Sequence, residues 1–274
     1  MKRTCGLSVS SVPVIAALLS LLAAALAPAS DWSAAAEENT TADADHYARC
    51  MAETRRNPAA ADRDAQSWLV AGGGHPAEHC GAVALVRLGR YQDGARRLAK
   101  LASEIKAPLA LRAQTLDQAG QAWLLAGRPD KAATVLSEAV AVEPDDPDIL
   151  TDRAEAFAGE RNDRAALGDL DHALALAPQR VDALVFRAAA YRRLHRLEPA
   201  LHDVEAALRL APNDPDALLE RGTLRHQMGD DRGARADWQR IAGLAPGDPA
   251  ETAARDDLAA LDVATGRAAP GKAP

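Results

Sequence analysis

The sequence predicts an all-α protein, an α-solenoid of stacked helix–turn–helix units that are each 34 residues long. The first observation is a period, because Pro144, Pro178, Pro212 and Pro246 are separated by 34 residues each. The second is composition. Hydrophobic residues make up 48% of the chain but aromatic residues only 3%, and this Ala- and Leu-rich content favours closely packed helices over a sheet core. The third is a series of helix-start signals that repeat with the same period.

Further columns of residues keep the 34-residue step and give each unit its internal pattern. They comprise one large residue, two small ones and a mostly Ala position near the end of the unit. The columns are Trp123, Phe157, Tyr191 and the polar replacement Arg225; Gly120, Ala154, Ala188 and Gly222; Ala132, Ala166, Ala200 and Ala234; and Ala139, Ala173, Ala207 and Ile241. Small residues suit places where two helices approach closely. We therefore expect each unit to be a helix pair that stacks on its neighbours and shares an elongated core.

Each unit has recognisable start and turn signals. In Asp146-Pro147 and Asp214-Pro215 the Asp is placed to cap a helix, and the Pro falls at the first helical position, where its missing N–H costs nothing. A polar break that contains Gly127 or Gly229 then ends the first helix. A second amphipathic helix follows and runs to the next proline.

These columns resemble those of the tetratricopeptide repeat. The resemblance covers residues 75–262 and implies a right-handed superhelix with a concave groove. Two middle units carry Arg161 and His195 where the family has a turn glycine, so we expect looser turns there. The implied division is a degenerate repeat at 75–112, four repeats at 113–146, 147–180, 181–214 and 215–248, and a capping helix at 249–262.

The N-terminus has the three parts of a secretory signal peptide, predicted at residues 1–29. Two basic residues at 2–3 precede an apolar run over 12–27, and small residues then allow cleavage after Ala29, with a site near Ala36 as the alternative. The apolar run is short for a membrane span, and no later segment is long and apolar enough for one. We therefore expect a periplasmic or secreted protein without an integral membrane span after cleavage.

The region before the repeats is predicted to form an N-terminal helical cap at 45–74. Two helices are expected there, at His46 to Arg56 and Ala59 to Val70, joined at Asn57-Pro58. Residues 30–44 and 263–274 are predicted to be a disordered linker and a disordered tail.

Two cysteines, Cys50 and Cys80, remain after signal cleavage. An even pair in an oxidising compartment predicts one disulfide, which would pin the cap onto the first repeat. The alternative is a pair of buried free thiols.

Two charged columns also keep the 34-residue step and are predicted to form structural ion pairs between repeats. In this interpretation a bidentate Arg–Asp contact fixes how the second helix of one unit docks on the first helix of the next. The residues are Arg153, Arg187, Arg221, Asp169, Asp203 and Asp237.

No catalytic motif, cofactor-binding loop or redox cysteine pair stands out, so we predict a non-enzymatic protein without a cofactor. The formal charge of −7 and the low aromatic content argue against nucleic-acid binding. His75 and His79 are four residues apart, a metal-ligand spacing, but Pro76 marks a first helical turn and no metal site is predicted.

The resemblance implies a peptide-binding groove lined by the first helix of each unit. The groove residues are predicted to be Asp117, Gln121, Leu124, Glu155, Val185, Arg192 and Arg193. The Lys and Asn pattern with which some members of the family bind a carboxylate is missing. We therefore expect a scaffold or adaptor that binds a protein or peptide. A structural or homo-oligomerising module is the alternative, and a metal-binding or enzymatic role of the N-terminal region is a weaker one.

Overall fold

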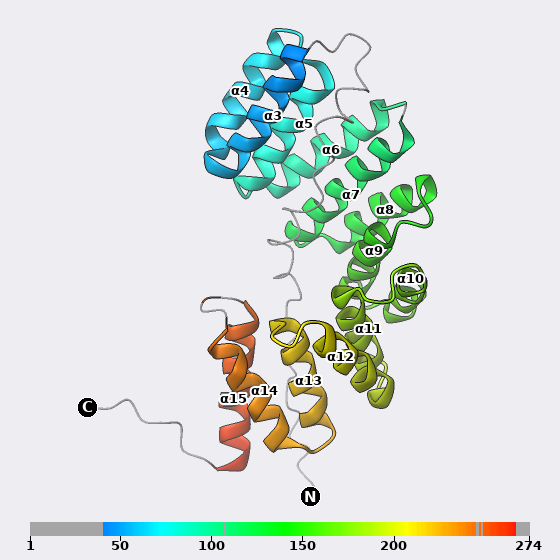
Figure 1. The fold of residues 1–274 in the computed structure, drawn as a ribbon, viewed down its shortest axis with the longest axis vertical. Helices are drawn as coiled ribbons and strands as arrows, with labels where there is room; N and C mark the ends of the chain where they lie inside the picture. The colour runs from blue at the N-terminus through cyan, green and yellow to red at the C-terminus, as the bar shows by residue number, and fades with distance from the viewer. Residues whose placement is uncertain (1–40, 107, 245–246, 248, 267–274) are drawn as a thin grey trace, which may run out of the picture.

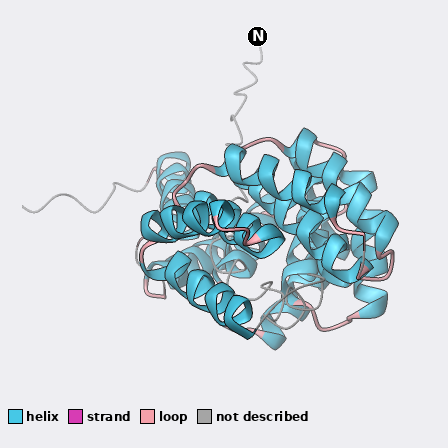
Figure 2. Cartoon of the chain, turned by 90° about the horizontal axis from the view of Figure 1, so that it is seen from above, coloured by secondary structure: helices cyan, strands magenta, loops and turns pink. Residues whose placement is uncertain are grey.

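The computed structural model describes residues 41–266 except 107, 245–246 and 248, and all regular structure in these residues is helical (Figures 1 and 2). The predicted signal peptide, most of the linker and the end of the tail lie outside the described residues. None of the described helices has the length and apolar character needed to cross a membrane.

The helices follow one another in antiparallel pairs. Their bounds are α3 Thr41–Arg56, α4 Pro58–Val70, α5 Gly74–Arg87, α6 Tyr91–Glu104, α7 Leu109–Leu125, α8 Pro129–Val142, α9 Pro147–Gly159, α10 Asp163–Leu176, α11 Val181–Arg193, α12 Leu197–Leu210, α13 Pro215–Gln227, α14 Asp231–Ala242 and α15 Pro249–Thr265.

The pairs α5/α6 to α13/α14 stack into a curved array that α15 closes (Figure 1). Each helix packs against its predecessor and successor, and the first helices of successive pairs also contact each other, as in α7 with α9 and α11 with α13. The predicted all-α solenoid of helix pairs is confirmed.

Some predicted bounds differ from the structure at the two ends. Helix α3 begins at Thr41, so residues 41–44 are helical and do not belong to a linker. Helix α15 continues to Thr265, beyond the predicted end of the capping helix. The expected caps are present where they are described: the Asp146 carboxylate accepts from two backbone N–H groups of α9, and the Asp214 carboxylate accepts from one of α13.

Small residues allow the two helices of each pair to approach. A Cβ atom at Gly120 would lie 2.4 Å from the Leu136 side chain, and one at Gly222 would lie 2.4 Å from Trp238. The alanines of the two small columns are fully buried. The core extends along the array in three stretches, and Phe157 packs against both the middle and the C-terminal one.

The turns within the middle units are as tight as those with glycine, so the expectation of looser turns was wrong. Arg161 and His195 adopt φ values of 63° and 59°, close to the 67° of Gly127. The same pair of backbone hydrogen bonds closes the turns at Arg161, His195 and Gly127. Tertiary packing of the two helices thus imposes a left-handed conformation that non-glycine residues adopt only with strain.

The predicted Arg–Asp ion pairs form, but within units, which corrects their assignment to contacts between repeats. In each pair, Nε and Nη2 of the arginine donate to the two carboxylate oxygens of the aspartate. These N···O distances are 2.7 and 2.7 Å for Arg153–Asp169, 2.7 and 2.9 Å for Arg187–Asp203, and 2.9 and 2.6 Å for Arg221–Asp237. Arg187 adds a contact to the preceding unit, 2.9 Å from Nη1 to Asp171.

The reason is the geometry of an antiparallel helix pair, in which residues equidistant from the turn face each other. Arg187 and Asp203 are each eight residues from the turn residue His195, and the other two pairs are equally symmetric about Arg161 and Gly229. The sixteen-residue separation therefore places each pair across one hairpin.

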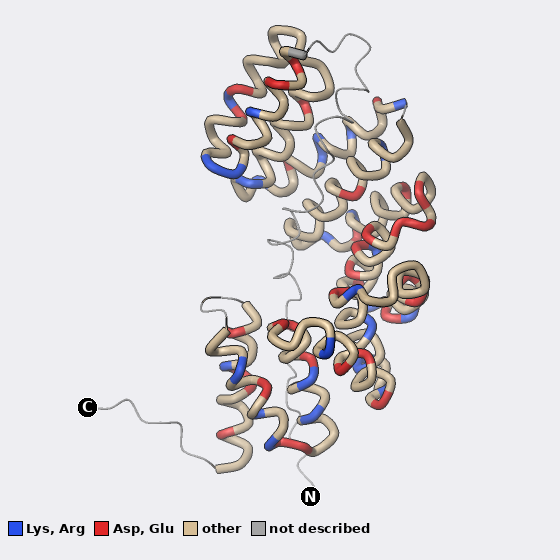
Figure 3. Tube along the Cα trace, in the orientation of Figure 1, with Lys and Arg blue, Asp and Glu red and all other residues tan. Residues whose placement is uncertain are grey.

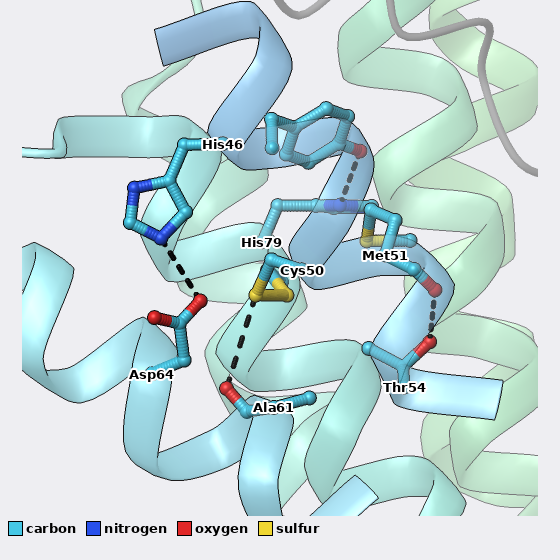
Figure 4. The surroundings of a disulfide bond; sticks show 9 residues. His46, Cys50, Met51, Thr54, Ala61, Asp64 and His79 are labelled. Carbon is cyan, nitrogen blue, oxygen red and sulfur yellow. Dashed lines mark hydrogen bonds and ion pairs between the residues drawn. A yellow bond between two sulfur atoms is a disulfide. The ribbon is translucent and has the colours of Figure 1, made fainter. Parts of the chain in front are cut away.

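The cap is joined to the first units by the Cys50–Cys80 disulfide, which confirms the predicted pairing (Figure 4). The sequence separation of 30 residues corresponds to a stabilisation of about 3–4 kcal/mol in the chain-entropy model. Beside it, the Tyr47 hydroxyl donates to Nδ1 of His79 over 2.9 Å, and Nε2 of His79 donates to Oε1 of Gln118 over 2.7 Å. Burial lowers the pKa of His79 to about 4, so the ring is neutral near pH 7.

This arrangement does not favour the metal-binding alternative. Both ring nitrogens of His79 are engaged, and His75 lies at the surface, 3.8 Å from Glu104. Within the described residues, no group of three or more His, Cys, Asp or Glu side chains is placed to hold a metal ion.

His195→Gly is expected to raise the free energy of unfolding by about 0.5–1 kcal/mol, because relief of left-handed strain exceeds the extra entropy of a glycine in the unfolded chain. The expected rise in melting temperature is roughly 1–4 °C. Gly229→Ala, at the same turn position with φ 88°, is the matched control and should lower the melting temperature. A decrease for His195→Gly would contradict the strain.

Asp203→Ala is expected to lower the free energy of unfolding by about 2–4 kcal/mol, because Arg187 would lose its two bonds to a carboxylate whose side chain is 4% exposed. Asp171→Ala removes the other acidic partner of Arg187, whose side chain is 57% exposed, and should cost less than about 1 kcal/mol. Denaturant unfolding of both variants measures the difference. Equal effects would show that the hairpin contact contributes no more to the free energy of unfolding than the exposed contact does.

Candidate binding face

The first helices α7, α9, α11 and α13 form one face of the array, which we call the inner face. Successive first helices contact each other, whereas the second helices α8, α10, α12 and α14 make no comparable contacts among themselves in the described part of the chain. The first helices must therefore lie on the inside of the curve, and Figure 1 shows α8 and α10 on its outer side. All seven predicted groove residues belong to α7, α9 or α11.

The two apolar groove residues are part of the core and do not form a binding surface. Leu124 is 5% exposed and packs in the middle core stretch, and Val185 is 8% exposed and packs in the C-terminal one. First helices that contact each other bury the side chains between them. The predicted apolar character of a groove at these two positions is therefore a property of the core.

The two arginines are held by carboxylates of this chain. Arg192 bonds to Glu220 of α13 through Nε at 2.6 Å and Nη2 at 3.0 Å, and Arg193 bonds to Asp163 of α10 over 2.5 Å. Both pairs are largely buried, with side-chain exposures of 14% and 10% for Arg192 and Glu220. They link successive units, which is the role that the sequence suggested for other arginines.

The acidic and amide groove residues meet a carboxyl group that the sequence analysis did not single out, Asp152. Nε2 of Gln121 donates to Asp117 over 3.0 Å and to Asp152 over 2.7 Å, so the amide bridges α7 and α9. The two carboxyl groups are close enough that each affects the pKa of the other. Oδ1 of Asp117 is buried and has no hydrogen-bonding partner within the described structure.

Glu155 lies one helical turn after Asp152 on the same face of α9 and is buried with no charge-compensating group. Its side chain makes no ion pair with any cation in the described structure, and its Oε2 atom has no hydrogen-bonding partner there. The negative charges that act on it belong to Asp152, Asp216 and Asp182, on α9, α13 and α11. Glu155 therefore points into the inner face, toward other acids.

The electrostatics of this cluster favour protonated carboxyl groups. Burial raises the pKa of Glu155 well above its usual value, and the three acids named above add to the shift. Burial and the charge of Asp152 do the same for the pKa of Asp117. The pKa of Asp152 is raised by burial to about 6, although the hydrogen bonds from Gln121 and Asp117 oppose the shift.

The sequence contains a signal for Asp152 that could have been used. Asp148, Asp152 and Glu155 are spaced by four and three residues, so they lie on one face of α9. The 34-residue period also aligns Asp152 with Gln118 and Glu220, and both of those side chains are buried and bonded to neighbouring helices. The period thus identifies a column beside the predicted groove positions that is polar and buried in three of its four units, with Phe186 as the apolar member.

Comparison with known proteins finds solved structures with a similar fold. No family model and no curated protein sequence matches the chain. TTC0263, a thermophilic TPR protein of Thermus thermophilus, is 20% identical with a TM-score of 0.56 over 69% of this chain and 100% of its own. MamA (41-end) from Desulfovibrio magneticus RS-1 is 20% identical with a TM-score of 0.52 over 60% and 90%. YrrB, described as a TPR protein with an unusual peptide-binding site, is 15% identical with a TM-score of 0.50 over 67% and 91%.

Asp152→Asn is expected to flatten the pH dependence of stability. A carboxyl group whose pKa rises from about 3.9 unfolded to about 6 folded contributes stability that is complete below pH 4 and is lost as the pH rises through 6. The groups that face it are Gln121 and Asp117 of α7, Asp148 of α9 and Asp182 of α11. Thermal unfolding from pH 4.5 to 8 should show a gain for Asp152→Asn over wild type that grows with pH, by about 1–3 kcal/mol.

Glu138→Gln, at an exposed position on the second helix α8, is the control and should follow the wild-type curve. Parallel curves for Asp152→Asn and wild type would contradict the raised pKa.

Proposed function

Because the chain has the tetratricopeptide-repeat fold, we propose that it is a non-catalytic scaffold that holds a protein or peptide on its inner face. The observation that carries the proposal is the pair of buried carboxyl oxygens without partners in the described structure, on Asp117 and Glu155. A buried polar atom without a hydrogen bond costs about 1–3 kcal/mol. A bound partner that donates hydrogen bonds to these oxygens would offset that cost. The stability of the free chain gives no reason to keep such unpaired groups.

The comparisons support the coarser part of this proposal. The neighbours share the fold, and one of them, YrrB, is described as having a peptide-binding site. The likeness is one of fold, so the ligand of that protein is not transferred to this chain. The support for the inner face itself comes from the burial and charge of Asp117, Asp152 and Glu155.

We also propose that the protein acts in the periplasm or outside the cell. The N-terminal pattern of a signal peptide supports this, and so does the Cys50–Cys80 disulfide, because such bonds persist in oxidising compartments.

Site-specific photo-crosslinking in the producing cells tests the proposal. A photoreactive amino acid at Asp148, an exposed position on the inner face, is expected to capture one or two reproducible proteins. The same group at Glu138 on α8 should capture none of them. N-terminal sequencing of the same material is expected to begin at Ser30.

Crosslinks confined to a second copy of this chain would replace the proposal with a homo-oligomerising module. Equal capture from positions 148 and 138 would contradict a function of the inner face. An uncleaved N-terminus in the cytoplasm would contradict export.

A further inference from the structure

We infer that the inner face binds a lysine or arginine side chain of a basic protein segment at Glu155, with Asp152 one turn before it on α9. This inference rests on the proposed function and narrows it, because it states the chemistry of the partner. It follows from the contacts between first helices, in which two buried acids, Asp152 and Glu220, are bonded to the preceding first helix while Glu155 has no such bond in the described structure.

The contact between α7 and α9 contains the first of these bonded acids, Asp152. Gln121 of α7 donates to Asp152 of α9, and the two residues are 31 positions apart. The 34-residue period places Glu155 and Phe186 in the equivalent relation, also 31 positions apart. Phe186 is a core side chain without a polar atom, so the next helix offers Glu155 nothing to bond with at this position.

The contact between α11 and α13 shows how the chain compensates another buried acid between first helices. Glu220 aligns with Asp152 by the period, and Arg192 of α11 neutralises it with two hydrogen bonds. The residue that aligns with Arg192 in the preceding unit is Ala158. Ala158 lies three residues after Glu155 on the same helix face, and it has a methyl group where the next unit carries a guanidinium.

The charges around Glu155 select the class of ligand. The neighbouring charges that act on Glu155 are those of Asp152, Asp182 and Asp216, and Asp117 lies beside Asp152. Asp182 is itself paired with Arg180, but Glu155 has no such cation in the described structure. A ligand must therefore be positively charged and donate hydrogen bonds. A bare metal ion is not favoured, because these acids form no cluster that could hold one within the described residues. An ammonium or guanidinium group meets both requirements without needing a closed set of ligands.

The surface next to Glu155 indicates that the cation belongs to a basic segment. The loop between α8 and α9 and the start of α9 carry Glu143, Asp145, Asp146 and Asp148, and Figure 3 shows this stretch as rich in acidic residues. Within the chain Asp145 contacts His172, Asp146 caps α9 and Asp148 pairs with Arg180, so the acids outnumber the basic side chains that meet them. A segment with several basic residues is complementary to this run, while one of its side chains reaches Glu155. Burial of the anchoring pair makes that single contact the most discriminating one.

A peptide library on the immobilised full chain, produced with its disulfide, tests the inference. The probes are random octapeptides with acetylated N-termini and amidated C-termini, so the only cations are side chains. Wild type is expected to enrich peptides with Lys or Arg at one fixed position. Replacing that residue by Gln should weaken the best peptide by about tenfold or more.

Two variants should reduce that difference to about twofold or less by independent routes. Glu155→Gln keeps the shape but cannot ionise, so it lacks the negative charge that Glu155 gains when a cation binds beside it. Ala158→Arg supplies an internal guanidinium that competes for Glu155. Both should unfold at or above the wild-type temperature, which separates loss of binding from loss of folding. Glu138→Gln on α8 is the matched control and should behave as wild type.

The outcomes separate this inference from the proposed function. Peptides captured on the inner face without a preference for Lys or Arg, or a preference that survives Glu155→Gln, would overturn the inference and leave the scaffold intact. Enrichment of no peptide on wild type or any variant would contradict peptide binding itself and the inference with it.

Discussion

The close approach of the two helices in each pair is the constraint from which the remaining architecture follows. Gly120 and Gly222 have no room for a Cβ atom because Leu136 and Trp238 fill the space in front of them. A helix pair packed this tightly exposes an apolar stripe on both sides, so it is stable only between neighbours. Stacking brings successive first helices into contact, and that contact buries the side chains that lie between them.

Polar groups that are buried between the first helices need hydrogen-bonding partners, and charged ones also need a compensating charge. Gln121 and Arg192 meet these needs by bonding to carboxyl groups on the next first helix. Glu155 does not, and the acids on α11 and α13 raise its free energy of ionisation further. Across the hairpins, by contrast, the chain neutralises its buried acids, as the three bidentate Arg–Asp contacts show.

A repeat pattern predicts which residues occupy equivalent positions, but it does not predict which neighbouring helix each side chain contacts. The 34-residue period determined the helix pairs, and cysteine number determined the disulfide. The period gives no sign of which of two equivalent neighbours a side chain contacts, and the Arg–Asp pairs were therefore assigned between units. Symmetry about the turn residues resolves that choice. The exposure of Leu124 and Val185 depends on how closely first helices approach, which no single column of residues encodes.

The unpaired state of Glu155 in the described structure is not imposed by the fold. The next unit has the same backbone, and there Arg192 compensates a carboxylate at the contact with the following helix. The unit that contains Glu155 has Ala158 at the aligned position, although a long side chain is accommodated there by the neighbouring repeats, as Leu124 and Arg192 show. A compensating arginine is thus structurally possible at this position, and the sequence has alanine instead beside a deeply buried acid. A cation supplied by a partner would give Glu155 the pairing that Arg192 gives Glu220 one unit later.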